Sequence, residues 1–144
     1  MELLEVRALV YGRLEHVWNC FTEPKHIMGW NFATDDWHCP SADSDLRKGG
    51  KFCYAMAAKD GSVTFDYWGV FRDVQPCSRL EFSLGEDLGS GRWVIVEFDE
   101  LPNNGGVMVV EKFVPEDQNP LEMQQMGWQM ILDNFKKYSE SAEG

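Results

Sequence analysis

Three carboxylates in apolar surroundings are the residues of this chain best suited to chemistry. Asp66, Glu97 and Glu111 lie in stretches that are otherwise rich in apolar residues and that we expect to be strands. A carboxyl group that faces an apolar interior has a raised pKa, because desolvation disfavours its charged form, and it can act as a general acid or base. On the outer face of a strand the same group is merely solvated. Acid–base catalysis therefore stays open as an alternative, with Asp66 or Glu97 as the favoured residue.

Metal and cofactor chemistry find less support in the residue spacing. His38 and Cys39 are adjacent, and adjacent ligands point apart in an extended chain, whereas zinc sites show spaced pairs. The glycines of segment 85–91 lack the Gly-Lys-Ser/Thr signature of a phosphate loop. We expect no metal and no cofactor. Without a Cys-x-x-Cys pair, the cysteines are predicted to be free thiols: Cys20, Cys39, Cys53 and Cys77.

The composition is that of an ordinary globular protein. The chain has 144 residues, of which 44% are hydrophobic and 26% charged, and we expect residues 1–144 to form a single domain. The net charge of −11 argues against nucleic acid as a partner, since such binding requires clustered positive charge. No apolar run approaches the roughly 20 residues of a membrane span, and the acidic start lacks the features of a secretory signal. A cytoplasmic protein that does not insert into membranes is expected.

The elements that must position any site follow from periodicity and turn residues. A strand is predicted over 2–10 and two short helices over 13–22 and 24–30, with at most one short strand near 37–39 in the segment that follows. From Gly50 onward the period changes to two, and turn residues separate successive segments, as in an antiparallel meander. Its strands are expected at 52–57, 63–74, 80–84, 92–99 and 107–113. One long helix to about Glu140 then closes an α+β arrangement.

The last helix carries the sharpest inference. Asn119 is positioned to cap it, with Pro120 at the first helical position and Glu122 completing a capping box. At 100° per residue its apolar side chains cover roughly two-thirds of the circle, whereas a flat sheet requires a stripe of only about 100°. We therefore expect a curled sheet or a partner to cover its flanks.

Polar and small residues lie within that apolar arc. Gln124 and Asn134 are amides that need partners when buried; they either join a structural hydrogen-bond network or orient the polar end of a ligand. Gly127 lets the sheet approach closely or leaves room for a guest. Aromatic residues either wall a pocket or fill the core. The candidate ligand-binding residues are Trp30, Trp37, Tyr54, Trp68, Gln124, Gly127, Trp128, Ile131 and Asn134.

Five segments also carry a resemblance to a known family. They are 31–40 (NFATDDWHCP), 45–52 (DLRKGGKF), 59–61 (KDG), 119–124 (NPLEMQ) and 127–138 (GWQMILDNFKKY). Nearly from end to end, the chain resembles the bacterial single-domain homologues of the activator of heat-shock-protein-90 ATPase, in the START-like (SRPBCC) superfamily. The resemblance implies a helix-grip fold, in which a curved antiparallel sheet wraps the long C-terminal helix around a cavity. It brings no catalytic motif with it.

Three functional hypotheses follow. The favoured one is a non-enzymatic binding module that holds a small, mainly hydrophobic ligand between the C-terminal helix and the curved sheet. The second, which the resemblance suggests, is a co-chaperone-like interaction domain that regulates a heat-shock-protein-90 ATPase. The third is an enzyme of the cyclase or hydratase kind found elsewhere in the superfamily, which would use a cavity carboxylate.

Overall fold

The computed structural model describes residues 3–142. The strands in this part of the chain are β1 (Leu4–Val10), β2 (Trp37–Ser44), β3 (Lys51–Ala58), β4 (Thr64–Gln75), β5 (Arg79–Leu84), β6 (Trp93–Glu100) and β7 (Val107–Phe113). The helices are α1 (Leu14–Thr22), α2 (Pro24–Ile27) and α3 (Leu121–Ser141), with a 3-10 turn at Glu86–Leu88. Two short helices after the first strand, a run of strands and one long terminal helix are the predicted order. The start of the strand expected over 2–10 lies partly outside the described residues.

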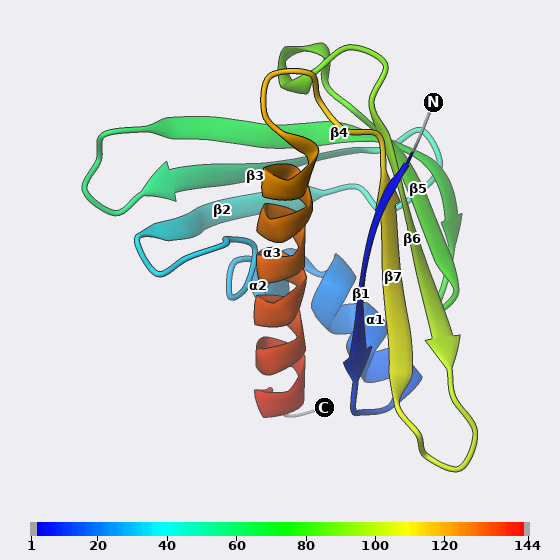
Figure 1. The fold of residues 1–144 in the computed structure, drawn as a ribbon. Coiled ribbons are helices and arrows are strands. Elements are labelled where there is room, and N and C mark those ends of the chain that lie inside the picture. Colours follow the sequence, from blue (N-terminus) through cyan, green and yellow to red (C-terminus); the bar gives the residue numbers. More distant parts are fainter. Residues whose placement is uncertain (1–2, 143–144) are drawn as a thin grey trace.

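The strands form one antiparallel sheet in the order β1-β7-β6-β5-β4-β3-β2. Strands β2 to β7 follow one another as a meander, and β1 pairs with the last of them. Figure 1 shows that the sheet is curled, so that β4, β3 and β2 run across behind α3 while β1, β7 and β6 run along it. This curved sheet around a long C-terminal helix confirms the predicted α+β helix-grip fold.

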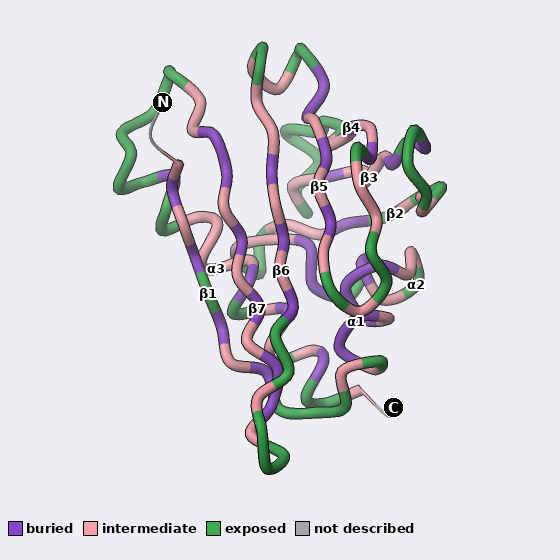
Figure 2. Tube along the Cα trace, turned by 90° about the vertical axis from the view of Figure 1, so that its right-hand side faces the viewer, coloured by how far each residue is buried: buried purple, intermediate pink, exposed green. Residues whose placement is uncertain are grey.

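Alternation along the strands places the core on the concave side. In β7, Val107, Val109, Glu111 and Phe113 are buried while the residues between them are less so. The same alternation runs along β5 and β6, where buried and more exposed positions follow one another in Figure 2. Because successive strand side chains point to opposite faces, one parity of each strand faces α3 and the other faces outward.

The polar stripe of α3 lies along the edge strand β1. Gln125 donates a hydrogen bond to the carbonyl of Glu5 (3.1 Å), and Gln129 donates one to the carbonyl of Arg7 (3.0 Å). Lys136 donates to the carbonyl of the next alternate residue on the same edge, Leu9 (2.6 Å). An edge strand has no neighbouring strand on its outer side, so the backbone carbonyls on that side lack strand partners. The polar side chains of α3 therefore cover an open edge of the sheet.

The apolar arc of α3 is enclosed only in part. Leu132 and Phe135 are buried, as expected for a helix held by a curled sheet. In the first two turns, however, Leu121, Met123 and Met126 are 50%, 60% and 65% exposed. The curled sheet therefore covers the apolar arc in the later turns of α3 and leaves these three side chains uncovered. Cover by a partner, the other expected possibility, stays a prediction for this end of the helix.

Two local expectations also need correction. The structure shows no side-chain cap on α3: the Asn119 amide donates to the Glu116 carboxylate (3.0 Å) instead of capping the helix. Strand β2 is longer than the expected 37–39 because a register shift between His38 and Ser41 accommodates Pro40. Proline is tolerated in β2 because β2 lies at the edge of the sheet.

Candidate functional site

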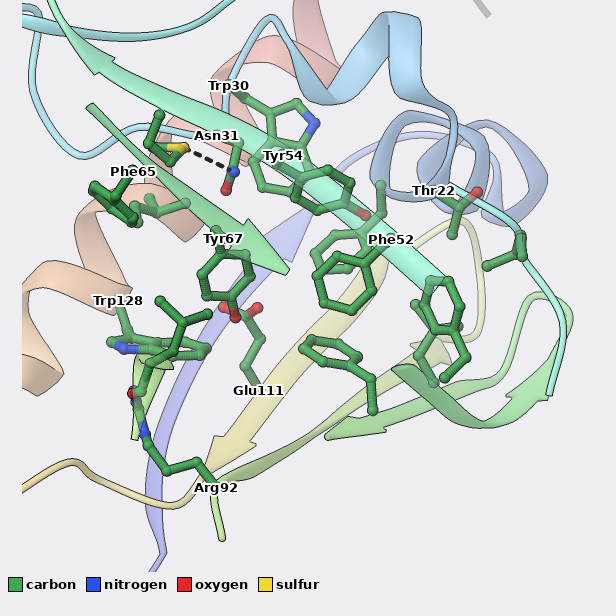
Figure 3. Close-up of a pocket in the computed structure, with 18 residues that line it drawn as sticks. Thr22, Trp30, Asn31, Phe52, Tyr54, Phe65, Tyr67, Arg92, Glu111 and Trp128 are labelled. Carbon is green, nitrogen blue, oxygen red and sulfur yellow. Dashed lines mark hydrogen bonds between the residues drawn. The ribbon is translucent and has the colours of Figure 1, made fainter. Parts of the chain in front are cut away.

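A cavity of about 280 Å³ lies between α3 and the concave side of the sheet. Strands β3, β4 and β5 supply the largest share of its wall, α3 supplies one side, and the region of α1 and α2 supplies another (Figure 3). The residues that line it are mostly aromatic or aliphatic: Phe21, Thr22, Trp30, Asn31, Leu46, Phe52, Tyr54, Met56, Phe65, Tyr67, Phe71, Leu80, Phe82, Leu88, Arg92, Glu111, Trp128 and Ile131.

Strand parity explains why these aromatic side chains converge. On β3 the alternate residues Phe52, Tyr54 and Met56 line the cavity. On β4, Phe65 and Tyr67 belong to the inward parity, and Tyr54 is the register partner of Tyr67. The rings of Tyr54 and Tyr67 are stacked with centroids 6.3 Å apart. The pleat thus gathers the aromatic residues of neighbouring strands on one face.

Two tryptophans are held in place by contacts outside the cavity. The indole Nε1–H of Trp30 donates to the carbonyl of Cys20 at 2.9 Å, which fixes its ring against the cavity from the side of α1. Trp128 of α3 stacks on Phe113 of β7, with ring centroids 3.9 Å apart and planes 8° from parallel. Both indoles are therefore positioned by contacts to residues that do not themselves line the cavity, Cys20 and Phe113.

Glu111 places a carboxyl group in this apolar space. It is 8% exposed and belongs to the inward parity of β7, between Val109 and Phe113. Burial raises the pKa of its carboxyl group to about 8, because the charged form is desolvated. At neutral pH most of this group is therefore the uncharged acid.

Tyr67 and Tyr54 bring two phenol groups to the same space. Desolvation is the largest cause that raises the pKa of Tyr67, and the nearby Glu111 carboxylate raises it further. Desolvation likewise raises the pKa of Tyr54. In Figure 3 the phenol end of Tyr67 and the carboxyl end of Glu111 point toward one another. Both phenols stay protonated at neutral pH and can donate hydrogen bonds.

Arg92 lines one side of the cavity and is held there by hydrogen bonds to two backbone carbonyls. Its Nε donates to the carbonyl of Val114 (3.0 Å), and its Nη1 donates to the carbonyl of Leu88 (2.6 Å). Burial lowers the pKa of its guanidinium, and the negative forms of Tyr67 and Glu116 raise it in part. These bonds hold the loop between β5 and β6 against the segment after β7.

Of the nine candidate residues, four line the cavity: Trp30, Tyr54, Trp128 and Ile131. Trp37 lies one layer further out, edge-to-face against Phe65 at 5.9 Å. Trp68 has the outward parity of β4, and its indole donates to Asp87 (2.7 Å). Parity alone excludes Trp68 from the inner wall.

The two amides of α3 and Gly127 do not line the cavity either. The side chain of Gln124 accepts from the backbone N–H of Glu116 (2.9 Å) and donates to the carbonyl of Asn119 (2.8 Å), which fastens the loop before α3. Asn134 donates to the carbonyl of Phe32. Both amides therefore take part in structural hydrogen bonds, the first of the two roles expected for them, and do not point at a ligand in the cavity. A Cβ atom at Gly127 would meet nothing within 4 Å, so the sheet does not approach it closely.

The two carboxylates favoured for the acid–base alternative do not face the cavity. Asp66 is exposed on the outward parity of β4, and Glu97 forms an outer-face ion pair with Lys112 at 3.2 Å. Of the three carboxylates considered for chemistry, Glu111 is the one that lines the cavity. The pattern Val107-x-Val109-x-Glu111-x-Phe113 indicates this position in the sequence. It places Glu111 on the same face of the strand as three apolar residues, and that face is the buried one.

Other reactive groups are sparse in the part of the chain that the structure describes. Within residues 3–142 no group of three or more His, Cys, Asp or Glu side chains is arranged to hold a metal ion. The four cysteines are free, as predicted. In the same range, none of the helices combines the length and the apolar character required to cross a membrane.

The fold and its interior define the class: a START-like helix-grip domain with an aromatic cavity beneath the C-terminal helix. The family described as "Activator of Hsp90 ATPase homolog 1-like protein" matches residues 13–140, and this chain belongs to that family.

Solved structures agree with this assignment. The AHSA1-like protein from Aeromonas hydrophila is 39% identical, with a TM-score of 0.87 over 99% of each chain. A protein from Cytophaga hutchinsonii is 43% identical, with a TM-score of 0.77 over 96% of this chain and 90% of that one. A protein from Nitrosomonas europaea shares the fold at 19% identity, with a TM-score of 0.78 over 94% and 92% of the two chains. A search of curated proteins gave no match.

Proposed function

We propose that this protein is a non-enzymatic binding module that holds one small, mainly apolar molecule in the cavity beneath α3. The cavity itself carries the proposal, with about 280 Å³ of space behind largely aromatic walls. Protein interiors are close-packed and contain few voids larger than a water molecule. Small-molecule sites are typically apolar pockets with a few placed polar groups, which is the character of this cavity.

The size of the cavity suits a compact ligand. An apolar cavity of about 150 Å³ binds benzene, so the space beneath α3 suits a molecule on the order of one or two fused rings. Trp128 and Ile131 on α3, with Tyr54 on the sheet, are the predicted residues that would contact it.

Binding of ethylnaphthalene tests the proposal. We expect this probe to shift the amide resonances of residues around the cavity, and we expect the Ile131→Trp variant to bind it at least tenfold more weakly because the new indole fills the space. Met126→Trp is the matched control, since Met126 lies on the same helix but is exposed. Unchanged binding by Ile131→Trp, or no binding by the unmodified protein, would contradict the cavity as a ligand site.

A second candidate function is regulation of a heat-shock-protein-90 ATPase, which the family name suggests. The observation in its favour is a pair of exposed apolar side chains near the start of α3, Met123 and Met126. Met123 and Met126 are neighbours on the helix surface because they are three residues apart. An exposed patch of this kind is typical of an interaction surface.

Stimulation of ATP hydrolysis tests this candidate. An excess of the protein should raise the turnover of a heat-shock-protein-90 chaperone, and a Met123→Lys/Met126→Lys double variant should not. The Ile131→Trp variant is the control, since it alters the cavity and leaves the exposed surface intact. An unchanged ATPase rate in the presence of the unmodified protein would dispose of this role.

A further inference from the structure

Glu111 and Tyr67 are two polar side chains of the cavity that lack partners in its wall. Among the lining side chains, all within the described residues, the hydrogen bond drawn in Figure 3 runs from the Asn31 amide to the sulfur of Met56. The Glu111 carboxyl group, on a side chain more than nine-tenths buried, instead points into the cavity beside the Tyr67 phenol. The polar atoms of both side chains border the open space of the cavity, so a ligand in that space can complete their hydrogen bonds.

The groups that face Glu111 leave it without a fixed counter-charge. From β4 comes the phenol of Tyr67, and from the segment before β6 comes Arg92, which is bound to two backbone carbonyls. The hydroxyl of Tyr54 points away from Glu111 (Figure 3). On the neighbouring strand β1 its register partner is Val6, and α3 contributes the indole of Trp128. Desolvation alone accounts for the raised pKa of Glu111.

We propose that Glu111 and Tyr67 form a two-donor site for an acceptor oxygen, and that the ligand is therefore an aromatic or fused-ring molecule with a neutral carbonyl group. This inference rests on the proposed binding function and specifies its ligand class. A carboxylic acid kept neutral by an apolar site donates a hydrogen bond, and a carbonyl oxygen has two lone pairs that can accept from both groups.

An ammonium ligand fits this site less well. It would require Glu111 to ionise, and burying two opposite charges costs desolvation that their attraction repays only when further hydrogen bonds satisfy them. The walls around Glu111 are mainly aromatic faces, with few acceptors for the remaining N–H groups. A neutral carbonyl demands no such compensation.

Three probes of one shape separate these ligand classes. Methyl naphthyl ketone carries the carbonyl, ethylnaphthalene carries no polar group, and naphthylethylamine carries a cation. We expect the ketone to bind about tenfold more tightly than the hydrocarbon, the gain of roughly one net hydrogen bond. The amine should bind no better than the hydrocarbon.

Two variants assign the preference to the carboxyl group. Glu111→Leu should bring the ratio of ketone affinity to hydrocarbon affinity to about one, and binding of the hydrocarbon by this variant reports that its cavity has folded. Glu111→Gln keeps an N–H donor and should retain part of the preference. The carbonyl stretch of the bound ketone should lie at lower frequency in the unmodified protein than in Glu111→Leu, because hydrogen bonds weaken the C=O bond.

The pH dependence gives an independent readout. Above about pH 8 the carboxyl group ionises and ceases to donate, so ketone affinity should fall there in the unmodified protein and stay level in Glu111→Gln. Equal binding of ketone and hydrocarbon, or tightest binding of the amine, would overturn the carbonyl site and leave the binding module intact. Binding of none of the three probes would overturn the binding module itself.

Discussion

Trp128 of α3 lies flat on Phe113 of β7, with the two ring centroids 3.9 Å apart and the planes 8° from parallel. This stack joins the long helix to the strand that carries Glu111, two residues before Phe113. The indole of Trp128 is also a wall of the cavity. One contact thus serves both the packing of the helix and the shape of the candidate site.

Truncation of Trp128 should weaken the fold. Trp128→Ala removes the stack and the packing of a partly buried ring, and we expect the free energy of unfolding to fall by about 2–4 kcal/mol. Trp128→Phe keeps an aromatic face and should lose less than half of that. Urea unfolding measures both, and an Ala variant as stable as the Phe variant would show that the stack is not stabilising.

Stability should fall as the pH rises, because of Glu111. The folded pKa of about 8 lies above the ordinary value of 4.5, so the folded state holds a proton that the unfolded state has released. The stabilisation that comes from this proton is complete below pH 4.5 and is lost between pH 4.5 and about pH 8. Over that range the free energy of unfolding falls by at most about 1.4 kcal/mol per pH unit.

Removal of the carboxyl group should flatten this dependence. Urea unfolding of Glu111→Gln across the same pH range should show a smaller slope than the unmodified protein. Glu97→Gln is the matched control, since Glu97 is paired with Lys112 on the outer face of the neighbouring strand. Equal slopes for the unmodified protein and Glu111→Gln would refute the raised pKa.

The hydrogen bonds between α3 and β1 should each add a modest stabilisation. Gln129→Ala deletes the bond to the Arg7 carbonyl, and we expect a loss of about 0.5–1.5 kcal/mol in thermal or urea unfolding. Lys137→Ala, an exposed change on the same helix, is the control and should lie within about 0.5 kcal/mol of the unmodified protein. A Gln129→Ala protein as stable as this control would mean that water replaces the lost donor without cost.

A methyl group at Gly127 should stabilise the protein. The Cβ atom would meet no heavy atom within 4 Å, and alanine is favoured over glycine inside a helix by about 1 kcal/mol. Gly127→Ala should therefore raise the melting temperature and leave ethylnaphthalene binding unchanged, because Gly127 is not a lining residue. Weakened binding by this variant would instead place Gly127 at the ligand site.

Much of the architecture could be predicted from local patterns. Alternating apolar residues and turn signals predicted the meander, and the wide apolar arc of the last helix predicted that a curled sheet or a partner covers its flanks. The site was harder. Trp30 and Trp128 line the cavity, whereas Trp37 and Trp68 do not. These residues are chemically alike, and what separates them is the face of the helix, strand or loop from which each side chain projects.

Glu111 illustrates the same limit. The sequence shows that Glu111 lies on the same strand face as Val109 and Phe113. The free-energy cost of burying its carboxyl group, however, depends on strands and helices far away in the chain. Asp66 and Glu97 lie in similar local surroundings and are solvated or paired. Gln125 and Gln129 of α3 hydrogen-bond to carbonyls of β1, and these partners lie more than a hundred residues earlier in the chain.

Local composition and periodicity thus determined which segments are strands or helices, since those preferences act between residues close together in the chain. Only the tertiary structure decided that the sheet curls far enough to leave a space beneath Trp128 and Ile131, and that Glu111 faces into it. Curvature and the register of distant strands determine where water is excluded, and the excluded water in turn determines the charge of a carboxyl group.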